Sequence, residues 1–213
     1  MERLLESLGL GFREVESCPR SSRLALVNDK LEVQVRKGPE HLQRFWTAHE
    51  VAHFLLASRL SVPFRKQAGD MRIESFCNDF ASHLLLPGNW LREALDDDPE
   101  SLFTALTISE SAVTSLLSTV VALNDRGGWN SVLVIWAIDS SGQWRASTVV
   151  GDCGCGLIRS ADNTTSYLDD IQSRIRKVAL PIRIDGSQKR VAAETVRWRN
   201  RCFSLFRRGS LVS

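Results

Sequence analysis

Two histidines and a glutamate lie close together in the sequence His49-Glu50-Val51-Ala52-His53, which has the pattern H-E-x-x-H. On a helix, residues four apart lie one turn apart on the same face, so both imidazoles can bind one ion. Glu50 then lies on the flank between them, within reach of a water on that ion. Zinc lowers the pKa of such a water to about 7, and a glutamate can remove its proton. The spacing therefore predicts a hydrolytic zinc site.

A catalytic zinc needs a third protein ligand and keeps one position open for water. Glu74 is our candidate, because it lies 21 residues after His53 on the next predicted helix, after a loop long enough to reverse the chain. Asn78 lies four residues further on the same helix face, where its amide can hydrogen-bond a ligand imidazole. The simpler interpretation is two satisfied core histidines without a metal. Two histidines on an apolar face, with a glutamate between them, favour the ligand set.

Two longer motifs surround these residues. Arg44–His53 reads RFWTAHEVAH, and Glu74–Pro87 reads ESFCNDFASHLLLP. The pair resembles the ImmA/IrrE family of zinc metallopeptidases, in which an "RFTxAHExxH" helix precedes an "ExxxNxFAxxLLxP" helix. Trp46 and His83 depart from that pattern, and neither is a predicted ligand.

The resemblance implies a gluzincin-like fold in which His49, His53 and Glu74 hold Zn²⁺ and Glu50 is catalytic. It also implies a substrate, because such enzymes cut a helix-turn-helix repressor encoded nearby and derepress stress, mobile-element or anti-phage defence genes. One alternative is a non-catalytic, metal-containing module that binds a repressor or DNA stoichiometrically. Another is a toxin–antitoxin partner built on the same fold. An intact Glu50 favours the enzyme, since a purely structural site has no use for a base.

A helix that begins near Pro39 and ends before Pro63 must carry H-E-x-x-H, because its inward stripe has helical spacing. That stripe comprises Leu42, Phe45, Trp46, His49, Ala52, His53 and Leu56. A polar loop at 65–70 leads to a second helix at about 71–86. Its predicted buried face comprises Ile73, Phe76, Cys77, Phe80, Ala81 and Leu84. A short helix around Leu4–Leu8 and strands at 23–27 and 31–35 precede both.

Residues 99–124 resemble a helix-turn-helix unit, with a turn at 107–109. No Lys or Arg lies between Arg92 and Arg126, which argues against groove binding and favours packing or docking of a repressor. Gly127-Gly128 is the predicted boundary between a peptidase domain at 1–126 and a second domain at 127–213. In the second domain, apolar and polar residues alternate with period 2 at 131–139 and 143–151, which predicts a β-hairpin. A helix at 165–178 and strands at 190–199 and 202–206 are predicted to follow. We therefore expect an α+β protein.

The C-terminal region is basic, with eleven Lys or Arg from Arg174 onward against Asp185 and Glu194. Interleaved aromatic residues suit single-stranded DNA, which we consider as an activator; a solvated basic sheet face is the alternative. The candidate contacts are Arg174, Arg176, Lys177, Lys189, Arg190, Arg197, Arg199 and Arg201. By position this half resembles the GAF-like sensor domain of IrrE-type and CapP-type proteins.

A glycine-rich loop at 151–156 carries Cys153 and Cys155. A thiolate is a good zinc ligand, so either cysteine can serve as an inhibitory ligand at the open zinc position. A redox pair, a second metal site and ordinary loop cysteines are the alternatives.

The 213-residue chain has a globular composition, with 43% hydrophobic residues and a net charge of +2. It contains no apolar run of about 18 residues and begins with an acidic segment, so we expect no membrane partner, no secretory signal and a cytoplasmic location. The five cysteines are an odd number, which does not suit a disulfide framework.

Overall fold

The computed structural model describes residues 1–18, 20–67, 69–95, 100–151, 158–161, 164–171, 173–198 and 200–212. It confirms a mixed α plus β protein. The chain forms two compact units, one of Met1–Trp90 with Ser109–Ser115 and one of Leu91–Ile108 with Leu116–Ser213. The Gly127-Gly128 pair, at which we placed the boundary, lies within the second unit.

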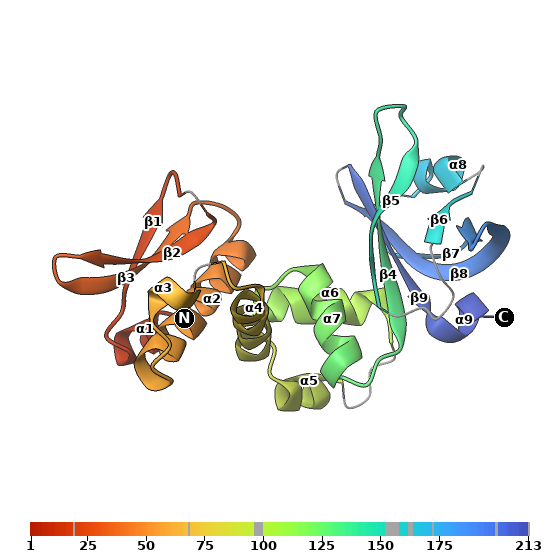
Figure 1. Cartoon of the computed structure of the whole chain (residues 1–213). Coiled ribbons are helices and arrows are strands. Elements are labelled where there is room, and N and C mark those ends of the chain that lie inside the picture. The colour runs from red at the N-terminus through yellow and green to blue at the C-terminus, as the bar shows by residue number, and fades with distance from the viewer. Residues whose placement is uncertain are drawn as a thin grey trace. The chain divides into compact units, whose positions relative to one another are not determined.

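The first unit places a three-stranded sheet on a helical layer (Figure 1). Its elements are α1 (Glu2–Ser7), β1 (Gly11–Val15), β2 (Ser22–Val27), β3 (Lys30–Arg36), α2 (Glu40–Arg59), α3 (Phe64–Gln67) and α4 (Met71–Leu85). The strand order is β1-β3-β2, with β1 parallel and β2 antiparallel to β3. Val33 and Val35 of β3 pack with Val51 of α2 in one core cluster. This packing holds β2, an edge strand, above the helix that carries H-E-x-x-H.

Small side chains separate α2 from α4. Ala48 of α2 clusters with Ala81, and Ala52 clusters with Cys77. Small residues at a helix contact let the two helix axes approach closely. Asp70 caps α4, because its carboxylate accepts a hydrogen bond from the Arg72 amide at 2.9 Å. The close contact and the cap bring the first turn of α4 to the histidine face of α2.

The second unit is built on a six-stranded antiparallel sheet with the order β5-β4-β9-β8-β7-β6. Its strands are β4 (Ser131–Ile138), β5 (Trp144–Val150), β6 (Ile158–Ser160), β7 (Arg176–Ile184), β8 (Ser187–Trp198) and β9 (Arg201–Arg207). Leu168 of α8 (Thr164–Asp169) and Leu211 of α9 (Arg208–Val212) join Trp136, Trp144 and Phe206 in the main core. The remaining helices are α5 (Gly88–Ala94), α6 (Leu102–Ala112) and α7 (Leu116–Arg126).

Most predicted elements are confirmed. They include the strands predicted at 23–27 and 31–35, which are β2 and β3, the helices α2 and α4, the 131–151 hairpin, and the last two strands, β8 and β9. The predicted helix at 165–178 is wrong beyond Asp169, because the chain then pairs with β8 as strand β7. The predicted loop at 65–70 contains the short helix α3 instead. Strand β1 and helix α5 were not predicted; β1 is largely exposed and lacks apolar alternation.

The predicted turn at 107–109 is also wrong, because α6 continues to Ala112. Val113, at φ 49°, ends the helix in the left-handed conformation. The Thr114 amide donates to the Ser109 carbonyl at 2.9 Å and the Val113 amide donates to the Glu110 carbonyl at 3.1 Å. This is a Schellman motif, for which a sequence normally offers a glycine as signal.

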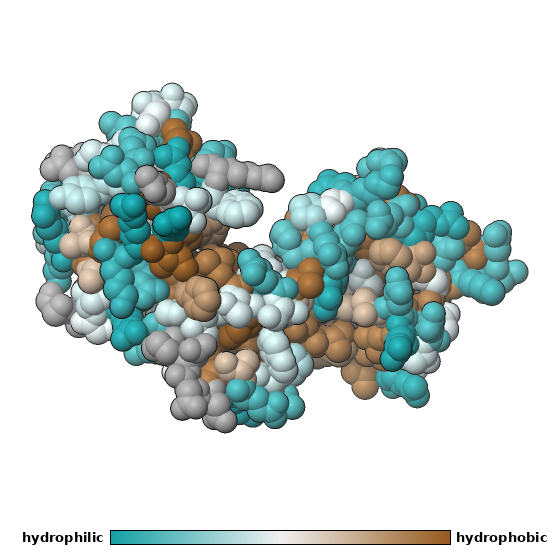
Figure 2. Space-filling model, turned by 180° about the vertical axis from the view of Figure 1, so that it is seen from behind, coloured by the Kyte–Doolittle hydropathy of each residue, from teal (hydrophilic) through white to brown (hydrophobic). Residues whose placement is uncertain are grey.

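No single described helix is long and apolar enough to cross a membrane; α6 and α7 meet that criterion only as a pair bent by 108°. On the face shown in Figure 2, brown hydrophobic patches interrupt a hydrophilic surface. Phe76, predicted to be buried, is 48% exposed. The most exposed of the other large apolar side chains are Leu26, Leu60, Met71, Phe103 and Trp198.

Candidate metal centre

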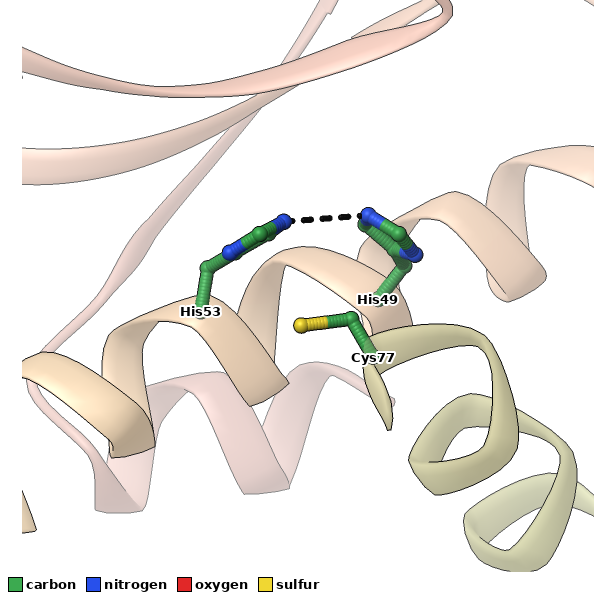
Figure 3. Close-up of side chains that lie close together, drawn as sticks. All are labelled: His49, His53 and Cys77. Atoms are coloured by element: carbon green, nitrogen blue, oxygen red, sulfur yellow. Dashed lines mark hydrogen bonds between the residues drawn. The ribbon is translucent and has the colours of Figure 1, made fainter. Parts of the chain in front are cut away.

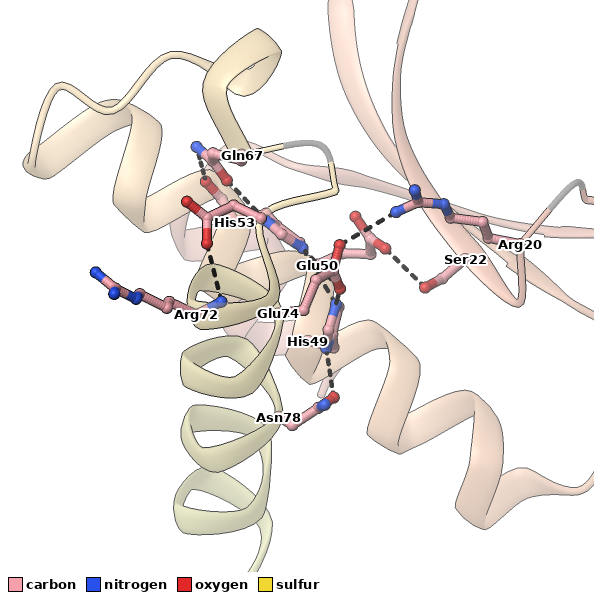
Figure 4. Close-up of polar contacts among 10 residues, drawn as sticks. Arg20, Ser22, His49, Glu50, His53, Gln67, Arg72, Glu74 and Asn78 are labelled. Atoms are coloured by element: carbon pink, nitrogen blue, oxygen red, sulfur yellow. Dashed lines mark hydrogen bonds and ion pairs between the residues drawn. The ribbon is translucent and has the colours of Figure 1, made fainter.

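Three ligand atoms of the kinds that zinc prefers converge between α2 and α4. The Nε2 atoms of His49 and His53 lie 3.1 Å apart. The Oε2 atom of Glu74 lies 3.2 Å from the first and 3.9 Å from the second (Figure 4). Ligands of a tetrahedral ion at the usual 2.0–2.1 Å are separated by about 3.3 Å, so these spacings fit one zinc ion.

Each histidine is held through its other ring nitrogen by an amide oxygen. The Nδ1 atom of His49 lies 2.9 Å from Oδ1 of Asn78, and that of His53 lies 2.7 Å from Oε1 of Gln67. A neutral ring that donates from Nδ1 carries a lone pair on Nε2. Two such lone pairs, together with the Glu74 oxygen, face one another. The contact drawn in Figure 3 between His49 and His53 therefore needs a proton on one ring or a cation between them.

Burial disfavours a second proton on the His49 ring. His49 is 5% exposed, and burial, followed by the neighbouring His53, lowers the pKa of His49 below its usual 6.5. A doubly protonated His49 is thus disfavoured at neutral pH. A metal cation bound here would supply positive charge to these three acceptors.

Cys77 lies beside the same histidines, and His49, His53 and Cys77 place ligand atoms within 4.8 Å of one another (Figure 3). Its sulfur is fully buried. Burial, with smaller contributions from Glu74 and Glu50, raises the pKa of the thiol to about 12. The Oε2 atom of Glu74 lies 3.2 and 3.9 Å from the two histidine nitrogens, so Glu74 and Cys77 are both candidates for a third ligand. Cys77 also packs between α2 and α4 beside Ala52.

Glu50 is buried beside the ligand atoms, with 7% of its surface exposed. The Ser22 hydroxyl, at the start of β2, donates to Oε1 of Glu50 at 2.7 Å. The Arg20 guanidinium, just before β2, lies 3.1 Å from Oε1 of Glu74, on the opposite side of that carboxylate from the histidines. Ser22 and Arg20 thus orient the predicted base and the third ligand respectively (Figure 4).

A cleft of about 750 Å³ opens onto these groups. The polar wall contains Arg20, His49, Glu50, His53 and Glu74. The apolar part of its lining comprises Leu24, Leu26, Leu31, Trp46 and Phe64. Leu26 is 70% exposed, which is unusual for a leucine that serves only the core. The cleft therefore places apolar side chains beside the candidate ligand atoms.

The predicted ligands His49, His53 and Glu74, the predicted base Glu50 and the supporting Asn78 all come together. Gln67, Ser22 and Arg20 were not predicted. Ser22 and Arg20 reach the site from the start of β2 and just before it, remote in sequence, whereas Gln67 comes from α3 between the two predicted ligand helices, and none belongs to a periodic pattern. Cys153 and Cys155, the candidate inhibitory ligands, lie outside the described residues, as does Arg199.

The other candidate nucleic-acid contacts belong to the second unit. Arg176 and Lys177 pair with Thr195 and Glu194, so these two neighbours point to opposite faces of the sheet. Arg190 and Arg197 lie over the rings of Tyr167 and Trp144 at 5.5 and 5.4 Å. Contact of these residues with nucleic acid stays a prediction.

No protein-family model matches the chain, and no curated protein matches it. Among solved structures it is similar to a Mycobacterium tuberculosis transcriptional regulator, with 13% identity and a TM-score of 0.49. The match covers 96% of this chain and 68% of that one.

Proposed function

We propose that the chain is a zinc metallopeptidase in which His49, His53 and Glu74 hold the metal and Glu50 is the general base. One observation carries the proposal: the two Nε2 atoms and the Glu74 oxygen converge within 3.9 Å of one another beside a buried carboxylate. Three protein ligands leave a fourth position for water, as in catalytic zinc sites.

Zn²⁺ bound there would lower the pKa of water to about 7 and polarise a peptide carbonyl. Glu50 is held by Ser22 at the wall of the cleft, where it can accept the proton of the attacking water and pass it to the leaving amine. The edge strand β2 lines the same cleft and can pair with an extended peptide through main-chain hydrogen bonds. The substrate segment is thus expected to be extended, as in a loop or linker.

The proposed substrate is a helix-turn-helix transcriptional repressor, whose cleavage would derepress stress, mobile-element or anti-phage defence genes. This part of the proposal rests on the resemblance of the two motifs to the gluzincin-like ImmA/IrrE peptidases. The antiparallel sheet of the second unit is compatible with a GAF-like sensor domain, and single-stranded DNA is the proposed signal.

The test is cleavage of the repressor encoded beside the gene by zinc-loaded wild type, Glu50→Gln and Glu40→Gln, with and without single-stranded DNA. Glu40 is an exposed glutamate in the first turn of the same helix and serves as the matched control. General-base catalysis contributes about 10²–10⁴-fold, so the loss in Glu50→Gln should fall in that range while zinc remains bound.

Cleavage by wild type and Glu40→Gln, but not by Glu50→Gln, supports the peptidase. Stoichiometric binding of the repressor without cleavage by any of the three proteins would show a metal-containing binding module instead.

A further inference from the structure

Gln67 is buried, with 2% of its surface exposed, although it lies on the four-residue helix α3. Its Nε2 donates to the carbonyl of Val62 at 2.6 Å and to that of His53 at 3.2 Å. A carbonyl only accepts hydrogen bonds, so these two contacts fix which end of the amide is nitrogen. The oxygen Oε1 must then face Nδ1 of His53, at 2.7 Å.

This arrangement determines which ring nitrogen of His53 carries the proton, a choice that helix α2 alone does not determine. An amide oxygen cannot donate, so Nδ1 must carry the proton and a neutral ring must present its lone pair from Nε2. That is the atom that faces His49 and Glu74. Asn78 makes the corresponding contact to His49, with Oδ1 at 2.9 Å from Nδ1.

We propose that Gln67 is a positioning residue that selects the zinc-binding tautomer of His53 and ties helix α3 to the metal site. This proposal about Gln67 rests on the zinc site of the proposed function but not on peptide cleavage. Because the same amide holds His53 and Val62, ordering of His53 by zinc also orders the segment from Val62 to Gln67. Phe64, in that segment, lines the cleft. Metal binding and the shape of the cleft wall are therefore coupled through one side chain.

The test compares Gln67→Leu, Gln67→Glu and a control, Gln43→Leu, a glutamine on α2 that does not line this cleft. The first measurement is zinc affinity by competition with a chromophoric chelator. Loss of a partner of a ligand histidine typically weakens metal binding by about 10–100-fold, which is the expectation for Gln67→Leu. Gln67→Glu keeps an oxygen for the Nδ1 proton but turns its second oxygen toward the carbonyls of Val62 and His53, so its loss of zinc affinity should be smaller than that of Gln67→Leu.

The second measurement is the ¹⁵N spectrum of the histidine rings in the metal-free proteins. Wild type and Gln67→Glu should show His53 protonated at Nδ1, whereas Gln67→Leu should show a mixture of tautomers. Hydrogen exchange at 62–67 should slow on zinc binding in wild type, and this slowing should be lost in both Gln67 variants, since neither retains the two amide donors.

Wild-type zinc affinity in a folded Gln67→Leu would overturn the proposal, as would equal losses in Gln67→Leu and Gln67→Glu. An unchanged His53 tautomer in Gln67→Leu would also overturn it. A zinc-loaded wild type that cuts nothing would contradict only the peptidase function, because none of the three measurements uses a substrate.

Discussion

The hydroxyl of Ser22 donates a hydrogen bond of 2.7 Å to the carboxylate of Glu50, across 28 positions of sequence and in a buried setting. The bond joins the edge strand of the small sheet to the predicted base, so the strand that lines the cleft also orients the group that is proposed to activate water.

Replacement of Ser22 by alanine should lower the rate of peptide cleavage without changing zinc affinity. A hydrogen bond to a charged group contributes about 1.5–3 kcal/mol, so kcat/KM should fall by about 10–100-fold if the bond acts fully in the transition state. Ser22→Thr, which keeps the hydroxyl, should retain most activity, and Ser7→Ala on α1 is a remote control. An equal loss of zinc binding in Ser22→Ala would assign the serine a structural role instead.

The third ligand can be identified by exchanging the two candidates on α4. Glu74→Gln should weaken zinc binding by at least about 10-fold, because it removes an anionic ligand oxygen. Cys77→Ala should bind zinc as wild type does and lose only packing, at roughly 1–2 kcal/mol of unfolding free energy. Chelator competition and urea unfolding measure the two quantities. A sulfur-to-metal charge-transfer band in the cadmium-loaded protein would contradict this assignment and favour Cys77.

The metal-free protein should lose stability as the pH falls below about 6.5. The pKa of His49 is lower in the folded chain than in the unfolded chain, so below 6.5 the unfolded state binds the proton first. The His49 contribution is therefore fully present above pH 6.5 and is lost as the pH falls toward the folded pKa. Urea unfolding at pH 7.5 and 5.5 should show a larger decrease for wild type than for His49→Gln. Equal decreases would show that His49 is not the group responsible.

The described cysteines should differ in their reactivity with iodoacetamide. Burial raises the pKa of Cys77 to about 12 and that of Cys202 to about 11, so both remain thiols in the native protein at pH 8. Cys18 is partly exposed and should be alkylated first. Peptide mapping by mass spectrometry after short exposures gives the order, and unfolding in urea should remove the differences. Early labelling of Cys77 would indicate that α2 and α4 separate readily.

The approach of His49, His53 and Glu74 to one another could be predicted from the sequence because its signal is local. Helical spacing places His49 and His53 on one face, and a second amphipathic helix supplies Glu74. Gln67 and Ser22 could not be predicted, because their contacts depend on how α3 and β2 fold back over α2. Hydrophobic periodicity indicates which face of an element is buried, but it does not indicate the remote polar group that will lie opposite.

The same distinction explains the errors in the fold. The segment at 174–178 has no helix breaker and its sequence favours a helix, whereas residues 176–178 pair with β8 as the start of strand β7. Val113 ends α6 in a conformation that glycine normally signals. In both places tertiary structure overrides the local preference on which prediction depends.

The proposed ligands His53 and Glu74 lie on different helices, separated by a stretch that includes α3. A metal ion joining them would act as a cross-link and close a loop of 21 residues. A closed loop leaves the unfolded chain fewer conformations, much as a disulfide does, without requiring an oxidising environment. The ion would then contribute to mechanical and proteolytic resistance as well as to chemistry, and a chelator would expose the connecting segment to proteases.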